Sequence, residues 1–189
     1  MTEDIIRSRR TVKPAQMNGQ KIDDVKVNRF LEAANWAPTH GKTEPWRFVV
    51  YRQESIPVFA NAHAEMYKES TPADKYKEPV YQKLKTIEGA SHLIIAYMQR
   101  GTNANIPAIE ELAAASAAVQ NLLLAAASEG IASFWSTSGR THHPIMKEYF
   151  GLKEEDVILG QIYLGYAASA TGDGVRLTPI EDKVRWVEC

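Results

Sequence analysis

Four neighbouring residues near the start of the chain could bind an anion together. They are Arg9, Arg10, Thr11 and Lys13. Guanidinium groups match the geometry of a phosphate, and ammonium and hydroxyl groups add further directional donors. Pro14 disfavours a helix through this stretch, so we expect the four side chains to lie on an extended turn. The alternative is a basic turn that faces only solvent, as runs of charge usually do.

A second group of candidate residues lies in the connection NWAPTHGKTEPWRFVVY, from Asn35 to Tyr51. Its two tryptophans, Trp36 and Trp46, could be core side chains at a corner between a helix and a strand. A core role is less natural for His40, which lies in a polar loop beside a glycine. We therefore interpret His40 as a ligand contact.

The usual sequence signatures of other enzyme classes are missing. We find no glycine-rich nucleotide loop, no hydrolase nucleophile elbow, no HExxH and no CxxC pair. His142 and His143 are adjacent, a spacing that does not place two ligands on one helix face. The single cysteine, Cys189, is the last residue, which disfavours a cysteine nucleophile. We expect no metal site.

The composition is that of an ordinary globular protein of 189 residues, which we expect to form one domain, 1–189. With 22 basic and 23 acidic side chains, the net charge of −1 provides no general attraction for nucleic acid or an anionic membrane. One cysteine permits no internal disulfide, and no apolar run suits a signal peptide or a membrane span. A cytoplasmic protein is expected.

Hydrophobic periodicity and breaker residues predict the elements that must position these groups. The predicted helices are Asp4–Arg10, Lys21–Trp36, two surface helices within Ser55–Gly89, the alanine-rich Ile109–Gly130, and Pro144–Gly151. The predicted strands are Trp46–Tyr51, Ser91–Met98, Ile131–Trp135 and Asp156–Ala167, with a further strand possible at Val184–Val187. This mixture favours an α/β or α+β sandwich with a central sheet. We interpret Ser55–Gly89 as a variable lid over the site.

Four stretches in the same order resemble the FMN-dependent nitroreductases, and most closely their compact branch. They are IIRSRRTVK, AANWAPTHGKTEPWRFVVY, SEGIASFWSTSG and RLTPIEDKVRW. The resemblance implies an α+β sandwich whose central sheet is mixed or antiparallel and flanked by helices. It also implies a homodimer of the domain-swapped style, formed along the long alanine-rich helix, with two FMN molecules at the subunit interface.

The resemblance also implies roles for individual residues. Arg9, Arg10 and Thr11 would hold the phosphate and ribityl chain of FMN, and Lys13 the pyrimidine edge of its ring. Trp36 and His40 would approach from the partner subunit. Trp135, Ser136 and Thr137 would lie beside the isoalloxazine, and Arg176 is a further phosphate candidate whose spacing from Pro179 is one residue off the family form. Glu44 stands where the family commonly has Gln.

The function implied is an oxidoreductase that takes hydride from NAD(P)H and reduces nitro or related electron-poor compounds by a ping-pong mechanism. The cofactor carries this chemistry, so we nominate no catalytic side chain. One alternative is a redox-silent protein that binds FMN for storage or sensing. Another is a colourless adaptor that dimerises through the alanine-rich helix.

Overall fold

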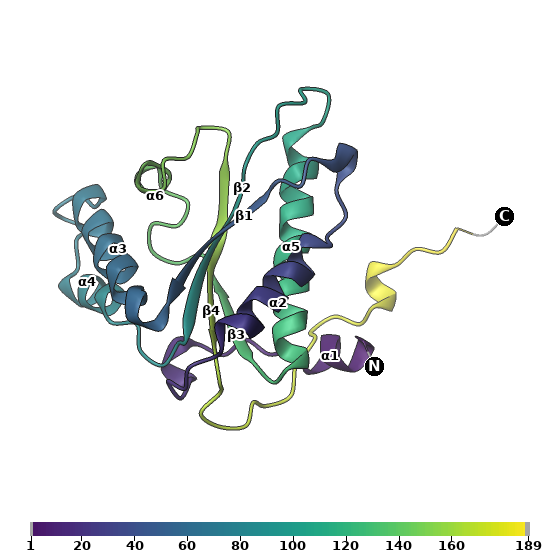
Figure 1. Ribbon diagram of the computed structural model, residues 1–189, viewed down its shortest axis with the longest axis horizontal. Coiled ribbons are helices and arrows are strands. Elements are labelled where there is room, and N and C mark those ends of the chain that lie inside the picture. The colour runs from purple at the N-terminus through teal and green to yellow at the C-terminus, as the bar shows by residue number, and fades with distance from the viewer. Residues whose placement is uncertain (1, 188–189) are drawn as a thin grey trace.

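The computed structural model describes residues 2–187 and has three layers, with a sheet between two sets of helices (Figure 1). The sheet contains β1 (Trp46–Arg52), β2 (His92–Met98), β3 (Ala132–Ser136) and β4 (Val157–Gly165), in the order β1-β2-β4-β3. The helices are α1 (Thr2–Ser8), α2 (Asp24–Asn35), α3 (Ile56–Ser70), α4 (Glu78–Lys85), α5 (Ala108–Ser128) and α6 (Pro144–Tyr149). Helices α2 and α5 cover one face of the sheet, and α3, α4 and α6 lie on the other.

Strand β2 lies inside the sheet, and its side chains are buried on both faces. Leu93 and Ile95 belong to the core beneath α3 and α6, whereas Ile94, Ala96 and Met98 belong to the core beneath α2 and α5. Because side chains alternate along a strand, a strand covered on both faces needs a continuous apolar run. All three strand pairings are antiparallel, so the sheet is antiparallel rather than mixed.

Helix α5 packs on α2 and the sheet through small residues. Ala115, Ala118 and Ala126 are fully buried there, and their size lets the helix approach its neighbours closely. By length and composition alone α5 could cross a membrane, yet it serves as a core helix of this fold. Residues 2–187 leave its other face uncovered: the side chain of Ile109 is 68% exposed, and Ala113 is exposed as well.

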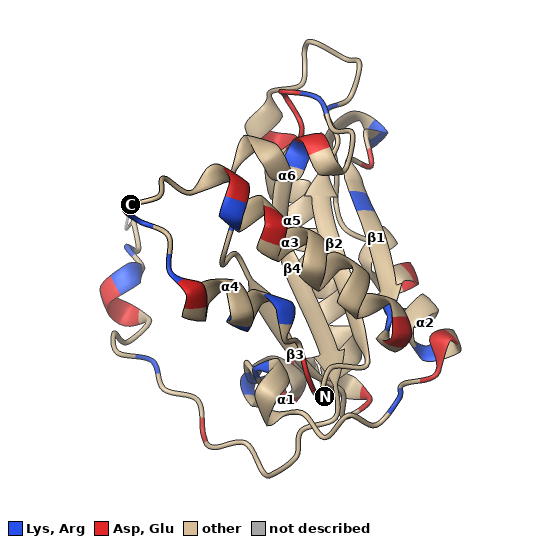
Figure 2. Ribbon diagram, turned by 90° about the vertical axis from the view of Figure 1, so that its left-hand side faces the viewer, with Lys and Arg blue, Asp and Glu red and all other residues tan. Residues whose placement is uncertain are grey.

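The side of the molecule formed by α3, α4 and α6 carries positive and negative side chains mixed together. Figure 2 shows lysine and arginine interspersed with aspartate and glutamate over these helices. This distribution agrees with the near-zero net charge. It offers no extended positive surface to a polyanion.

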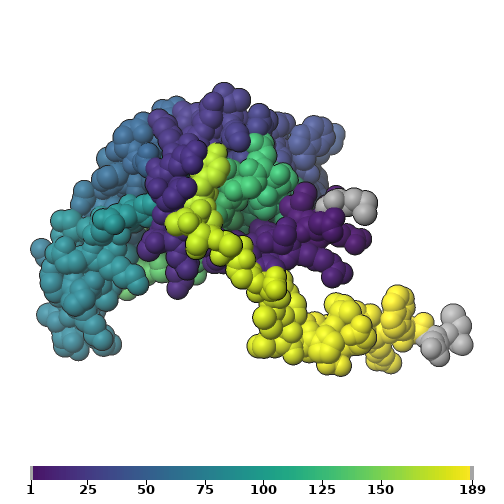
Figure 3. Space-filling view, turned by 90° about the horizontal axis from the view of Figure 1, so that it is seen from below, coloured from purple at the N-terminus to yellow at the C-terminus, as the bar shows by residue number. Residues whose placement is uncertain are grey.

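The last twenty described residues, 168–187, leave the body of the protein as an extended arm (Figure 3). The prediction of a strand at Val184–Val187 is wrong within the described residues, where the arm contains one 3-10 turn, Glu181–Lys183, and no strand. A strand needs a hydrogen-bonded neighbour, and no segment of residues 2–187 pairs with Val184–Val187. Its apolar side chains are exposed, including Leu177 and Trp186. Cys189 lies outside the described residues.

Candidate functional site

The basic segment near the N-terminus lies beside strand β3. Thr11 forms a parallel bridge with Ser133, and the backbone N–H of Val12 donates to the Ser133 carbonyl at 2.9 Å. Val12 is buried, while Thr11 and Lys13 on either side of it are exposed. The pairing therefore presents a hydroxyl and an ammonium group next to the strand that ends in Trp135 and Ser136.

The two adjacent arginines differ in their hydrogen bonds. Arg10 donates from Nε to the Gly172 carbonyl at 2.9 Å and from Nη1 to the Arg7 carbonyl at 2.5 Å and the Arg9 carbonyl at 3.0 Å. Arg10 thus ties the end of α1 to the start of the C-terminal arm. Within residues 2–187 the half-buried side chain of Arg9 has no hydrogen-bond partner, so it is available to a ligand.

Trp135 is fixed by an irregularity in the neighbouring strand. The β2–β4 pairing shifts between Ala96 and Tyr97 and skips Leu159, and Trp135 Nε1 donates to the Leu159 carbonyl at 2.9 Å. Gly160 has φ +151°, and a Cβ there would lie 2.4 Å from Trp135 Nε1. The missing side chain at this position makes room for the indole.

The segment after Trp135 carries a pair of hydroxyls. Ser136 is buried, and its Oγ lies 2.9 Å from Ser138 Oγ and accepts from the Ser138 N–H at 3.2 Å. Thr137 between them is exposed. The sequence prediction included Ser136 and Thr137 but missed Ser138, whose only signal is a third hydroxyl in the run STS.

Helix α3 holds the loop that follows these hydroxyls. The Arg140 backbone N–H donates to His63 Nε2 at 2.9 Å, and Gly139 is so close that a Cβ would lie 2.3 Å from the same nitrogen. Burial and, secondly, the positive charge of Arg140 lower the pKa of His63 to about 4. A neutral His63 can accept this hydrogen bond, whereas the protonated form cannot.

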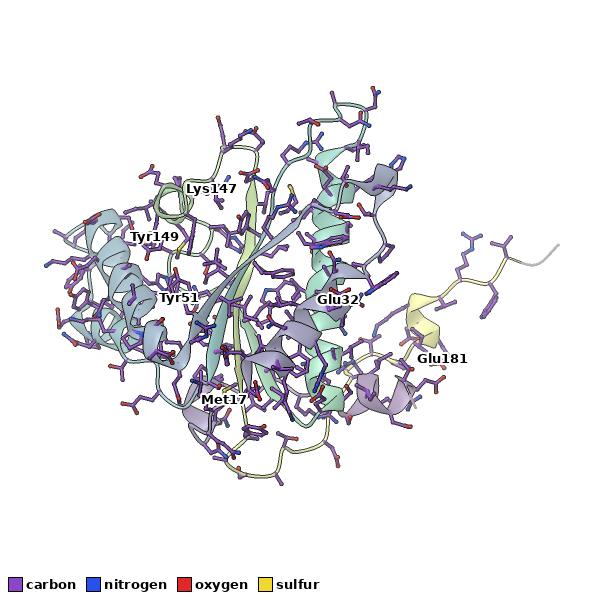
Figure 4. The ribbon with its side chains drawn as sticks, in the orientation of Figure 1. Met17, Glu32, Tyr51, Lys147, Tyr149 and Glu181 are labelled. Carbon is purple, nitrogen blue, oxygen red and sulfur yellow. The ribbon has the colours of Figure 1, made fainter. Side chains whose placement is uncertain are left out.

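Trp36 and His40 lie on the side of the sheet that α2 and α5 cover, opposite α3. The side chain of Trp36 is 80% exposed, and its Nε1 donates to Glu32 at 3.1 Å. His40, in the 3-10 turn η2 (His40–Lys42), has Nδ1 2.6 Å from a carboxylate oxygen of Glu110. In Figure 4, Glu32 marks this side of the sheet, and Tyr51 and Tyr149 mark the opposite side.

Trp46 is a core side chain at the corner between α2 and β1, as the sequence analysis suggested. It is 6% exposed, packs with the core beneath α2 and α5, and donates from Nε1 to Asn35 at 3.0 Å. Its hydrogen bond to the last residue of α2 ties the start of β1 to the end of that helix. Trp46 is therefore a corner of the scaffold that carries the connection containing His40.

The basic segment and His40 lie toward opposite ends of α5. Ile5 of α1, just before the basic segment, lines a small groove with Leu124 and Ser128 near the end of α5. His40 contacts Glu110 in its first turn. The 21 residues of α5 span about 30 Å, so one chain does not bring the basic segment and His40 to one small ligand. Arg176 joins neither group: it is exposed on the arm and donates to its neighbour Val175.

Among the described residues no cluster of three or more His, Cys, Asp or Glu side chains could hold a metal ion. An open groove of about 550 Å³ lies between α2 and the edge strand β1 and includes Leu31, Phe48 and Val50. None of the predicted ligand residues lines it.

Comparisons with known proteins agree on the fold and the family. A family model described as "Nitroreductase family" matches residues 6–166. The chain is 29% identical over 181 residues to YfhC of Bacillus subtilis (strain 168), a protein provisionally named an NAD(P)H nitroreductase. This match covers 95% of the chain and 91% of YfhC.

Two solved structures share the fold. The nitroreductase-like family protein from Bacillus cereus has a TM-score of 0.82 at 24% identity, covering 100% of this chain and 96% of that one. A provisionally named nitroreductase from Desulfovibrio desulfuricans, crystallised in complex with FMN, has a TM-score of 0.73 at 22% identity, covering 99% and 96%. The predicted α+β nitroreductase-like fold is confirmed.

The lowered pKa of His63 predicts a loss of stability in weak acid. Because the folded pKa lies below the ordinary value of 6.5, the unfolded chain gains a proton at a higher pH than the folded chain does. The contribution of neutral His63 is complete above pH 6.5 and declines as the pH falls to about 4, by about 3 kcal/mol for a shift of this size.

Urea unfolding of the parent and of His63→Gln between pH 7 and pH 4 measures this contribution. Glutamine keeps an acceptor for the Arg140 N–H but does not titrate, so the variant should lose less stability across this range. His142→Gln, at an exposed histidine, is the matched control and should follow the parent. An equal pH dependence in the parent and His63→Gln would contradict the assignment.

Proposed function

The chain belongs to the nitroreductase family, and from this premise we propose that it is an FMN-dependent oxidoreductase. It takes hydride from NAD(P)H and passes it to nitro or related electron-poor compounds. The name of YfhC includes NAD(P)H, which supports NAD(P)H as the hydride donor. The Desulfovibrio structure contains FMN, which supports FMN as the cofactor. The observation that carries the proposal is the pairing of the basic segment with β3, which places cationic and hydroxyl donors beside Trp135.

The donors in this region fit the chemistry of FMN. Arg9 has an unpaired guanidinium for the phosphate, and the exposed hydroxyl of Thr11 suits the phosphate or the ribityl chain. Lys13 would place a positive charge at the pyrimidine edge of the ring, and the indole of Trp135 offers an apolar wall. Arg10 acts chiefly by holding the segment in place, since its Nε and Nη1 donate to backbone carbonyls.

When bound, FMN supplies the redox chemistry, accepting hydride from one substrate and delivering it to the next. The residues of this chain bind it, orient it and leave one face open. A single open face that serves both substrates in turn gives ping-pong kinetics. No side chain in the region is required as an acid, a base or a nucleophile, and water can supply protons.

We propose that the site is completed by a second copy of the chain. The basic segment and His40 lie toward opposite ends of α5, so an antiparallel pairing of two α5 helices brings His40 of one copy toward the basic segment of the other. Trp36 precedes His40 in the same connection, and we assign it to the same half of the site. The uncovered apolar face of α5, including Ile109, supports this pairing. Isologous two-fold dimers are the commonest oligomers.

The C-terminal arm gives independent support for a dimer. Leu177, Ile180 and Trp186 are exposed on the arm beyond its contact with Arg10. Edge strand β1 and the groove beside it offer unpaired backbone groups and apolar surface. An arm that exchanges onto the other copy would satisfy both surfaces, in the domain-swapped style. Arg176 would then act, if at all, at the other copy's site.

We also propose that residues 1–189 act as a single domain and that the protein works in the cytoplasm.

The segment Ser55–Gly89, which we interpreted as a lid, has two parts that differ in packing. Helix α3 is firmly packed, with Phe59 and Ala64 at or near zero exposure, whereas α4 has no buried residue. Leu84 of α4 packs close to Gly139 in the loop after β3. We therefore assign the covering role to α4 rather than to the whole segment.

An absorption spectrum of the purified protein tests the proposed function. We expect a yellow protein whose flavin band is bleached by NADH or NADPH without oxygen and restored by a nitroaromatic compound. Colour that persists after the nicotinamide is added would favour a redox-silent flavin-binding protein. Protein that stays colourless with added FMN would favour the adaptor alternative.

Separate substitution of the two arginines tests their assigned roles. Arg9→Ala should raise the Kd for FMN about tenfold or more, because it removes charge-assisted bonds to the phosphate, and should leave the unfolding free energy unchanged. Arg10→Ala should lower the melting temperature as well, since its intrachain bonds are lost. Lys153→Ala, at an exposed cation in the loop before β4, is the control. Unchanged FMN affinity in Arg9→Ala would refute the phosphate assignment.

Sedimentation of the FMN-bound protein should give the mass of a dimer. Charge replacement on the uncovered face of α5, as in Ala113→Glu, should weaken the dimer and the FMN affinity together, because one chain lacks half of the site. The exposed Glu155 of the loop before β4 offers a control position, Glu155→Lys. A monomer that retains FMN would exclude a shared site.

A further inference from the structure

Two adjacent glutamates in the first turn of α5 have different surroundings. Glu111 is 1% exposed and forms an ion pair with Arg100. It also accepts the Gly101 N–H at 3.1 Å, while Arg100 donates to the Ile106 carbonyl at 2.5 Å. These bonds fix the connection between β2 and α5 as a platform at the start of the helix.

The turn that carries His40 rests on this platform. Gly41 has φ +59°, and a Cβ there would lie 2.5 Å from Cδ1 of the buried Ile106. Lys42 and Glu44 also have positive φ, 56° and 43°, a conformation that costs non-glycine residues on the order of 1 kcal/mol each. Such a backbone persists because its surroundings hold it, so the position of His40 is well determined.

The side chain of His40 is fixed by the other glutamate. Its Nδ1 lies 2.6 Å from Glu110 Oε2. An ionised carboxylate only accepts, so Nδ1 must carry the hydrogen. In a neutral imidazole the second nitrogen, Nε2, then has a free lone pair. Within residues 2–187 no hydrogen-bond partner contacts Nε2.

We infer that Glu110 is a positioning residue, which presents His40 Nε2 as a hydrogen-bond acceptor to FMN bound at the basic segment of the partner copy. This inference rests on the proposed function. FMN offers matching donors in its ribityl hydroxyls and its ring imide N–H. The contact between His40 and Glu110 contributes little to the free energy of folding, because the two side chains are 64% and 45% exposed and exposed pairs add little stability.

The first test reads the tautomer of His40 in FMN-free protein at pH 8.5, where an ordinary histidine is neutral. Long-range proton–nitrogen NMR spectra identify which ring nitrogen carries hydrogen. The parent should show the Nδ1–H form, and Glu110→Ala should shift the ring toward the Nε2–H form. Glu110→Gln, which keeps an oxygen acceptor, should restore most of the parent spectrum. The Nε2–H form in the parent would overturn the inference.

The second test is a double-mutant cycle on FMN affinity, measured by quenching of flavin fluorescence. Glu110→Ala should raise the Kd about fivefold when His40 is present and less than twofold in a His40→Ala background, because Glu110 acts through His40. Glu155→Gln, at an exposed glutamate, is the matched control. Equal losses in both backgrounds would overturn the inference. Failure of the parent to bind FMN would overturn the proposed function, while the NMR result would still decide the tautomer.

Discussion

The length of α5 is the constraint on which the arrangement of this protein depends. The helix is about 30 Å long, buries alanines against α2 and the sheet, and keeps the basic segment and His40 toward its opposite ends. A ligand smaller than that distance can meet both groups only if a second molecule supplies one of them. One element therefore provides the core of the subunit, the separation of the two half-sites and the surface that can reunite them.

Sequence patterns predicted most of the fold because the signals were local. Asp23 caps α2 by accepting the Val25 N–H, and the apolar run of β2 matches a strand covered on both faces. The prediction failed at Val184–Val187 because β-propensity describes a side chain's fit to a pleated surface, not the presence of a neighbouring strand. The sequence also did not distinguish a mixed sheet from the antiparallel one.

The site was only partly predictable, since its decisive contacts join residues far apart in the chain. The resemblance identified the basic segment and the segment ending in Trp135, and the structure joins them through Ser133. Nothing local indicated that Arg10 would be used on a carbonyl 162 residues away, or that His40 would pair with Glu110, 70 residues further on. These partners follow from topology, which a single sequence does not encode residue by residue. The roles of the ligand residues and the dimer remain proposals.

The close fit of Trp135 over Gly160 links two positions that belong to different strands. The indole occupies the volume that a side chain at position 160 would need, so the two residues share a single space. Homologous chains should therefore vary these positions together, with a larger residue at 160 accompanied by a smaller one at 135. Divergence in this family would then reshape the wall of the binding region in paired steps instead of single substitutions.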